Sequence, residues 1–325
     1  MTRRPKLLVL ELWGVGDLAV ATPFLRAAAE KFDVTLLAKP HALALRPRLW
    51  PNVNVLTLDA PWTAFRGKYQ LTKWPWRKLA AVRHQLAAAP FDFGVSARHD
   101  PRDHFFMWLA GVQHTVGVPR LGSEMFLTHP LAVPHTTPHR YDVWRQLAQP
   151  LGLELPAREK LSVPPTSGKN ILLHSGARLD PRVWPLDHYQ QLAARLRAAG
   201  HTVQVACDER QVKWWREHGE TGVAAPRLLE ELFTLLDQAA AFVGNCSGPG
   251  HLAAVFGVPT FTIFGPSQPG EFLPVHPRAE FIEDNSCPHK PCADYCHFDS
   301  PRCLENLPLE TVAARVETFC AQQLK

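Results

Sequence analysis

The strongest constraint on the fold is an alternation of apolar, strand-like runs with helical stretches, which runs through the first half of the chain and starts again in the second. The strands expected in the first half are Lys6–Leu12, Val34–Ala38, Val53–Leu58 and Phe93–Ser96. The strands expected in the second half are Asn170–His174, Thr202–Ala206, Ala241–Gly244 and Thr260–Phe264. Helices that connect parallel strands cover both faces of their sheet. The sequence therefore predicts an α/β protein with two Rossmann-like, doubly wound domains.

A stretch without periodicity separates the two halves. The segment at 151–169, LGLELPAREKLSVPPTSGK, is broken by prolines and glycines, which is typical of a linker. We place the boundary near residue 165, which gives domains at 1–165 and 166–325. A final helix, expected at Leu309–Leu324, is long enough to return to the first domain. We expect the two domains to face each other across a cleft at the carboxyl ends of their sheets, where open α/β folds bind ligands.

The composition favours a globular protein that binds anions. The 325 residues carry a net charge of +5 at pH 7, which favours nucleotides, phosphorylated glycans or an anionic membrane surface and does not indicate nucleic acid. The apolar run LLVLEL near the start contains Glu11 and ends in a Gly-rich turn, so we interpret it as a buried strand rather than a signal peptide. No run approaches the roughly 20 apolar residues of a membrane-spanning helix. We expect a cytoplasmic protein.

The first candidate site is the turn after the first expected strand. Gly14, Val15, Gly16 and Asp17 open a helix there, so backbone amides and the positive end of the helix dipole converge. A tight turn capped by Asp17 is the structural alternative. The turn lacks the G-x-G-x-x-G spacing of dinucleotide-binding proteins, which argues against an oxidoreductase.

Four segments of the chain resemble glycosyltransferase family 9. They are ELWGVGDLAVATPFLRAAAEKF, ARHDPRDHFFMWLAGVQHTVG, HSGARLDPRVWP and FVGNCSGPGHLAAVFGVPTFTIFGPSQP. The resemblance implies a GT-B fold and a transfer reaction that inverts the sugar without a catalytic metal. It also implies a nucleotide-heptose donor, usually ADP-linked, and an anionic or lipid-linked acceptor such as the lipopolysaccharide core. The first domain would bind the acceptor and the second the nucleotide sugar.

The resemblance also assigns roles to individual residues. Asp17 matches the acid that takes the proton of the acceptor hydroxyl, and Arg182 matches the cation that meets the diphosphate. Glu209 follows a strand where α/β folds place an acid against ribose hydroxyls, although Asp208 is adjacent. The residues expected to bind the donor are Ser175, Gly176, Arg178 (the alternative to Arg182), Arg182, Glu209, Cys246, Ser247, Gly248 and His251. The residues expected to bind the acceptor are Gly16, Arg98, Asp100 and Arg102.

One position departs from the family pattern. Cys246 stands where the family usually has an aspartate before Ser-Gly-Pro, so a carboxylate that would touch the donor sugar is missing. A different donor sugar, a weak enzyme or a non-catalytic protein that only binds nucleotide sugars would each fit this change. A small buried thiol is the structural alternative.

Four cysteines near the C-terminus follow the spacing C-x4-C-x3-C-x6-C. They are Cys287, Cys292, Cys296 and Cys303. Thiolates this close in sequence can surround one tetrahedral ion, so we predict a structural zinc or iron site, with reduced thiols or disulfides as the alternatives. Some family members that glycosylate proteins are similar in having a cysteine-bound iron loop. A protein heptosyltransferase is therefore the alternative function.

A basic and aromatic segment lies in the first half of the chain. The sequence KYQLTKWPWRKLAAVRH combines Trp74 and Trp76 with Lys73, Arg77 and Lys78. This mixture suits contact with a glycan, a phosphate or an anionic membrane surface, which would make the protein peripheral on the inner membrane. A basic amphipathic helix that packs on its own domain is the structural alternative.

Overall fold

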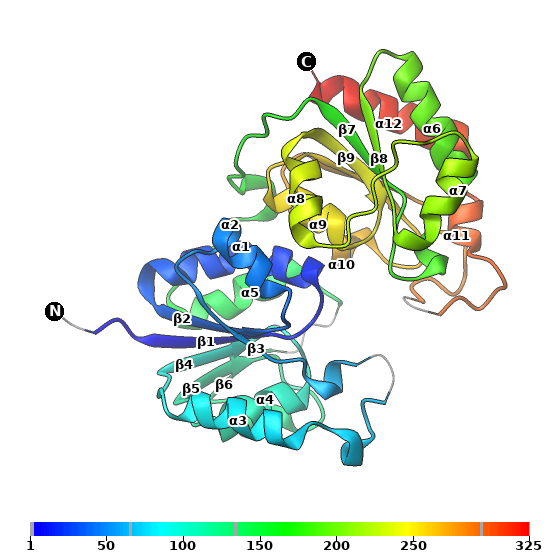
Figure 1. Ribbon diagram of the computed structural model, residues 1–325. Coiled ribbons are helices and arrows are strands. Elements are labelled where there is room, and N and C mark those ends of the chain that lie inside the picture. The colour runs from blue at the N-terminus through cyan, green and yellow to red at the C-terminus, as the bar shows by residue number, and fades with distance from the viewer. Residues whose placement is uncertain (1–2, 65–66, 133–135, 293–294, 325) are drawn as a thin grey trace. The chain divides into compact units, whose positions relative to one another are not determined.

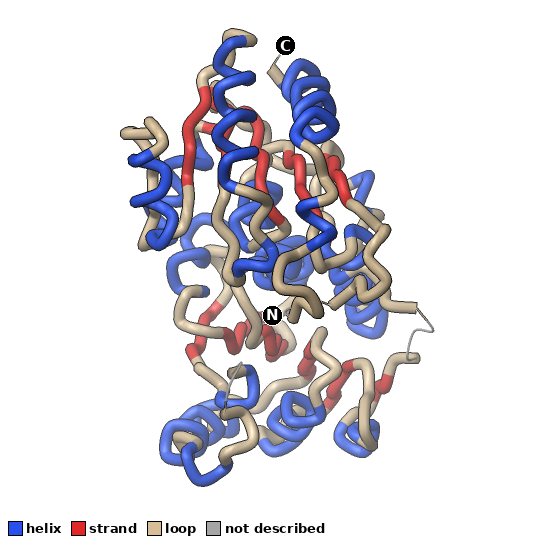
Figure 2. The backbone as a smooth tube through the Cα atoms, turned by 90° about the vertical axis from the view of Figure 1, so that its right-hand side faces the viewer, coloured by secondary structure: helices blue, strands red, loops and turns tan. Residues whose placement is uncertain are grey.

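The computed structural model describes residues 3–64, 67–132, 136–292 and 295–324, and the chain divides into two compact units, Met1–Pro156 and Ala157–Lys325. In each unit, one sheet lies between two layers of helices (Figures 1 and 2). All the strand pairings within the described residues are parallel. The predicted α/β class with two Rossmann-like units is confirmed.

Unit 1 has the strand order β3-β2-β1-β4-β5-β6. Its strands are β1 (Lys6–Glu11), β2 (Asp33–Ala38), β3 (Asn54–Thr57), β4 (Phe93–Ser96), β5 (His114–Gly117) and β6 (His129–Pro130). Its helices are α1 (Val15–Lys31), α2 (Ala42–Leu49), α3 (Trp76–Ala87), α4 (Pro101–Leu109) and α5 (Arg140–Ala148). Helices α1, α2 and α5 cover one face of the sheet, and α3 and α4 cover the other (Figure 1). The central strand β1 is apolar from Leu7 to Leu10 because both of its faces are buried there.

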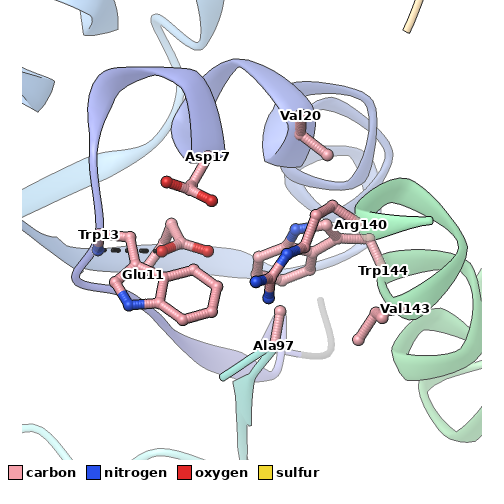
Figure 3. A pocket seen from close by; sticks show the side chains of 8 residues that line it. All are labelled: Glu11, Trp13, Asp17, Val20, Ala97, Arg140, Val143 and Trp144. Carbon is pink, nitrogen blue, oxygen red and sulfur yellow. Dashed lines mark hydrogen bonds between the residues drawn. The ribbon is translucent and has the colours of Figure 1, made fainter. Parts of the chain in front are cut away.

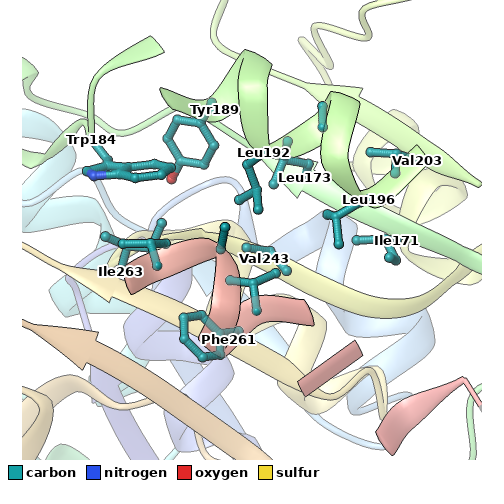
Figure 4. Close-up of a cluster of buried hydrophobic side chains, with 14 of the residues drawn as sticks. Ile171, Leu173, Trp184, Tyr189, Leu192, Leu196, Val203, Val243, Phe261 and Ile263 are labelled. Atoms are coloured by element: carbon teal, nitrogen blue, oxygen red, sulfur yellow. The ribbon is translucent and has the colours of Figure 1, made fainter. Parts of the chain in front are cut away.

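Unit 2 has the strand order β11-β10-β9-β7-β8. Its strands are β7 (Asn170–His174), β8 (Val203–Ala206), β9 (Ala239–Asn245), β10 (Thr260–Phe264) and β11 (Ala279–Glu283). Its helices are α6 (Leu186–Ala198), α7 (Val212–Glu217), α8 (Leu229–Asp237), α9 (Gly248–Val255), α10 (Pro269–Phe272), α11 (Arg302–Glu305) and α12 (Leu309–Gln323). On one face of the sheet, side chains such as Leu192 of α6 pack against Val243 and Phe261 of the strands (Figure 4).

The eight expected strands are all present, with bounds that agree within two residues. The sequence analysis missed the helices α2, α5, α10 and α11 and the strands β5, β6 and β11. Helix α5 has a clear apolar face, formed by Tyr141, Trp144 and Leu147, that the sequence analysis overlooked, whereas several of the other elements are short or exposed. Helix α2 is short and contains Pro47, β6 has two residues, and β11 is an edge strand with the exposed side chain of Phe281.

The linker segment packs on unit 2. The sequence analysis places the boundary near residue 165, whereas the compact unit begins at residue 157. The hydroxyl of Thr166 donates a hydrogen bond to the carbonyl of Ala239 (2.6 Å). Pro164 lies so close to Gly257 that a Cβ on Gly257 would collide with the Pro164 carbonyl group. These contacts explain why the proline-rich residues belong with the second sheet.

The apolar face of α12 packs inside unit 2. Val316 and Phe319 are fully buried in the same core as α6 and the strands. Arg195 of α6 also donates hydrogen bonds to Glu317 (2.9 Å) and Glu310 (2.6 Å) of α12. Within the described residues, no helix combines the length and the apolar character needed to span a bilayer.

The contact between Gly257 and the linker predicts a strong effect of a small substitution. Gly257→Ala is expected to destabilise the protein by about 2–4 kcal/mol, because an L side chain is strained at φ +85° and also collides with Pro164. Gly200→Ala is the matched control, since its φ is +89° and open space surrounds the added Cβ. The control is expected to lose only about 1 kcal/mol. Urea denaturation measures both, and equal losses would contradict the contact.

Candidate functional site

Each sheet has one point where the strand order reverses, and the candidate residues lie there. In unit 1 this point falls between β1 and β4, and in unit 2 between β7 and β9. At such a point, the helices that follow the two neighbouring strands lie on opposite faces of the sheet. This opens a crevice at the carboxyl ends of the strands, where ligands bind. The predicted site residues largely follow these four strands directly, in the segments 13–17, 97–102, 175–182 and 246–251.

Unit 1 holds a small pocket at its reversal point (Figure 3). Its lining residues are Glu11, Trp13, Asp17, Val20, Ala97, Arg140, Val143 and Trp144. Asp17 of α1 and Glu11 of β1 lie side by side, and Arg140 of α5 extends into the same space (Figure 3). The sequence analysis missed Glu11 and Arg140 as site residues. A glutamate inside an apolar strand was a usable signal for Glu11, but nothing marked Arg140, which comes from a helix that was not expected.

Asp17 both caps α1 and faces the pocket. The backbone N–H of Gly14 donates to Asp17 Oδ2 (3.1 Å), so Asp17 does cap the helix, as the structural alternative expected. Gly16 lies in the same first turn. Burial raises the pKa of Asp17, while Arg140 and the Gly14 N–H act in the opposite direction. Burial and the neighbouring Asp17 raise the pKa of Glu11 to about 8. A carboxylate with a raised pKa is a stronger base, so the pocket suits proton removal.

The predicted acceptor residues Arg98, Asp100 and Arg102 come together in the structure. Arg98, which is 4% exposed, pairs with Asp100 (3.1 Å) and with the fully buried Asp103 (3.3 Å). Arg102 binds Asp100 through two hydrogen bonds of 2.8 Å each. Burial raises the pKa of Asp103 to about 6, and the Trp62 indole N–H donates to this carboxyl group (2.7 Å). Asp103 is a buried charge partner that the sequence analysis missed.

The side chain of Ser175 is engaged inside unit 2. Its hydroxyl donates to Gln211 Oε1 (3.1 Å) and accepts from the Trp215 indole N–H (3.0 Å). Ser175 therefore ties the end of β7 to the segment that carries α7. At Gly176, a Cβ would collide with the Asp208 carboxylate, which explains why a glycine stands there.

The end of β9 brings several predicted donor residues together. Ser247 is the N-cap residue of α9, and its hydroxyl has no hydrogen-bond partner among the described residues. Burial raises the pKa of the Cys246 thiol to about 11, and the positive charge of Arg182 acts in the opposite direction. Gly248 and the buried His251 belong to the first turn of α9. Backbone amides at a helix start and a guanidinium are groups that bind phosphates.

Two other predicted donor residues lie on the surface. Both carboxylate oxygens of Glu209 accept hydrogen bonds from Arg227 (2.9 and 2.6 Å), and the Glu209 side chain is 60% exposed. Arg178 is also exposed. Asp208, next to Glu209, lies against Gly176 and is therefore the acid nearer to the end of β7.

The four cysteines of the C-terminal loop do not form a metal centre in the described part of the chain. All four are free thiols, and no group of three or more His, Cys, Asp or Glu side chains there is arranged to hold a metal ion. Cys303 is buried in the apolar core of unit 2, and the Cys296 thiol donates to the Ser300 carbonyl (3.6 Å). The predicted zinc or iron site is not supported.

The known proteins that this chain resembles include heptosyltransferases and another glycosyltransferase. Lipopolysaccharide heptosyltransferase 1 of Pseudomonas aeruginosa is 30% identical over 210 residues, which are 56% of this chain and 59% of that protein. The chain thus matches less than two thirds of the length of this relative. The solved structure of E. coli heptosyltransferase WaaC with ADP is 18% identical, with a TM-score of 0.74 over 97% of this chain and 99% of that chain. The bacterial iron-containing dodecameric glycosyltransferase TibC from enterotoxigenic E. coli is 17% identical, with a TM-score of 0.57 over 99% of this chain and 77% of that chain.

At these identities the solved structures establish the fold, which is that of the GT-B heptosyltransferases. The sequence model of glycosyltransferase family 9 (heptosyltransferase) matches residues 80–299, which is more than half of the chain. This protein therefore belongs to glycosyltransferase family 9.

Proposed function

We propose that this protein is an inverting glycosyltransferase that moves a heptose-like sugar from an ADP-linked donor to a lipopolysaccharide-core or related bacterial glycan. The observation that carries the proposal is the Asp17 carboxylate, which lies in the unit 1 pocket with a raised pKa. The match to the family model begins at residue 80, so the role of Asp17 rests on its own motif and surroundings. The choice of sugar and nucleotide is supported by the Pseudomonas relative and by the WaaC structure with ADP.

The proposed reaction is a single displacement. The acceptor oxygen bonds to the anomeric carbon while the bond from that carbon to the diphosphate breaks, so the configuration inverts. Asp17 takes the proton of the acceptor hydroxyl, and ADP leaves with the electrons of the broken bond. Arg102, whose side chain is 33% exposed, is the member of the Arg98, Asp100 and Arg102 group best able to bind an anionic acceptor.

The donor is proposed to bind unit 2 at the ends of β7 and β9. Arg182 and the amides at the start of α9 would neutralise the diphosphate, and the Ser247 hydroxyl would find its partner there. Gly176, Cys246, Gly248 and His251 would line the same site. The surface position of Glu209 makes Asp208 the competing contact for the ribose.

A glycan acceptor is favoured over a protein acceptor. The cysteine loop suggested a protein acceptor, because some family members that glycosylate proteins bind iron through such a loop. TibC is one iron-containing relative. No group of side chains that could hold a metal ion is found among the described residues, so that feature gives no support here.

The proposed base predicts a selective loss of turnover. Asp17→Asn is expected to lower kcat by about 10²- to 10⁴-fold, because the amide cannot accept the hydroxyl proton, while the affinity for ADP stays within about twofold. Transfer from ADP-heptose to a heptose-free lipopolysaccharide acceptor measures kcat, and calorimetry measures ADP binding. Glu30→Gln, an exposed change on the same helix, is the control. Near-normal turnover by Asp17→Asn would refute Asp17 as the base.

The proposed donor site predicts a difference between two neighbouring arginines. Arg182→Met is expected to weaken ADP binding at least about tenfold, because it removes the positive charge that acts on Cys246. Arg178→Met, at the exposed position, is expected to change it less than about twofold. Calorimetry with ADP compares the two variants. The reverse order, or equal losses, would assign the diphosphate contact differently.

We also propose that unit 1 contacts the cytoplasmic face of an anionic membrane. On α4, Phe105 and Trp108 are 42% and 55% exposed, and their rings stack with centres 5.8 Å apart. The Phe126 ring lies 5.2 Å from Phe105, and the exposed Tyr69 lies 5.9 Å from the Arg102 guanidinium. Exposed aromatic rings on α4, and a separate exposed tyrosine beside a proposed acceptor residue, suit an acceptor anchored in lipid.

The charge near this cluster matches an anionic surface. Helix α3 lies on the same face of the sheet as α4 (Figure 1) and exposes Trp76, Arg77 and Lys78. No acidic residue occurs in the sequence between Asp59 and Asp92. Each basic residue near an anionic bilayer contributes about 1 kcal/mol.

The membrane contact predicts binding that depends on both charge and aromatic side chains. The protein is expected to sediment with phosphatidylglycerol vesicles and at least about fivefold less with phosphatidylcholine vesicles. The double variant Phe105→Ser, Trp108→Ser is expected to lose at least about fivefold of the binding, because its apolar insertion is removed. Leu228→Ser, at another exposed apolar residue, is the control. Binding that survives the double change would refute this surface.

A further inference from the structure

Glu11 is a buried acid that the proposed reaction does not use. It is the last residue of β1, is 1% exposed, and lines the pocket beside Asp17 (Figure 3). Its Oε1 accepts the backbone N–H of Trp13 (3.1 Å). A carboxyl group buried at the end of a strand is costly unless its charge is removed or paired.

The charges around the pocket do not balance two ionised acids. The groups that face Glu11 are Asp17 from α1, Arg140 from α5 and Arg98 from the loop after β4. Arg98 already pairs with two carboxylates, at 3.1 and 3.3 Å. Among the described lining residues, Arg140 is the one guanidinium that meets both Glu11 and Asp17. One cation beside a buried and a half-buried carboxyl group favours keeping one proton on the pair.

The local contacts indicate which acid keeps that proton. Asp17 lies at the first turn of α1, where the helix dipole favours a negative charge, and it accepts the Gly14 N–H. Glu11 is more deeply buried, and burial followed by the charge of Asp17 raises its pKa to about 8. The arrangement therefore matches an ionised Asp17 beside a neutral Glu11 at neutral pH.

We propose that Glu11 is a positioning residue that holds one proton, donates a hydrogen bond within the pocket, and so orients the Asp17 carboxylate toward the acceptor hydroxyl. This inference rests on the proposed role of Asp17 as the base. During transfer, the acceptor proton moves to Asp17, so the pair goes from one proton to two, and the added proton leaves to solvent after the product departs. Glu11 does not itself accept the substrate proton.

The test compares two replacements of Glu11. Glu11→Gln keeps a donor and keeps an acceptor for the Trp13 N–H, so it mimics the neutral acid, whereas Glu11→Met has neither. With ADP-heptose and a heptose-free lipopolysaccharide acceptor, Glu11→Met is expected to lower kcat at least about tenfold with little change in KM. Glu11→Gln is expected to restore at least about fivefold of that loss. Equal losses in the two variants would overturn the positioning role.

A pH series gives a readout that a structural role would not move. The wild-type profile of kcat is expected to show an inflection near the Glu11 pKa of about 8, and the Glu11→Gln profile is expected to lack it while keeping the limb at lower pH. An inflection near pH 8 that persists in Glu11→Gln would overturn the inference.

The pH dependence of stability tests, without any substrate, whether Glu11 keeps its proton in the folded protein. The folded protein binds the Glu11 proton more tightly than the unfolded chain does, since the pKa is about 8 in place of the ordinary 4.5. The stabilisation is therefore complete below about pH 4.5 and is lost as the pH rises towards 8. The Tm of the wild type is expected to fall across this range relative to that of Glu11→Gln. If the Tm curves of the two proteins run parallel with pH, Glu11 does not retain a proton. Turnover by Asp17→Asn would instead refute only the role of Asp17 as the base.

Discussion

The site depends on the fact that the strands of each sheet run in the same direction. Their carboxyl ends meet at one edge, so loops that are far apart in sequence become neighbours wherever the strand order reverses. In unit 1, Leu10 of β1 pairs with Ser96 of β4, which places the Glu11 to Asp17 turn beside the loop that carries Arg98. In unit 2, His174 of β7 pairs with Gly244 of β9, which places the two loops of the proposed donor site beside each other.

Buried polar side chains hold these loops in place. Asn245, at the end of β9, donates to the Ser175 carbonyl (2.9 Å) and accepts the Trp184 backbone N–H (3.0 Å). It therefore ties both ends of the loop that carries Arg182. An unpaired buried amide would cost about 1–3 kcal/mol, so these bonds fix one arrangement of the loop. The Ser175 hydroxyl, which the sequence analysis assigned to the donor, belongs to the same internal support.

Charge balance distinguishes the two parts of the unit 1 site. Arg98 is enclosed by Asp100 and Asp103, so this cluster is neutralised from within and serves as a rigid wall. The pocket next to it holds the carboxyl groups of Glu11 and Asp17, and burial raises the pKa of both. A rigid, paired cluster beside an acid with a shifted pKa is the arrangement expected where a proton has to be moved.

The sequence by itself determined the α/β class, the central strands and the turn that carries Asp17, because apolar runs and turn residues act locally. It did not determine β11, a partly exposed strand at the edge of a sheet, and the apolar face of α5 was overlooked. Arg140 reaches the pocket only through the packing of α5, and the paired state of Arg98 depends on burial, so neither follows from spacing along the chain. The cysteines show another limit, since close spacing predicted a metal site and no group that could hold a metal is found among the described residues. Local pattern fixes the elements, but convergence, burial and charge pairing are properties of the packed chain.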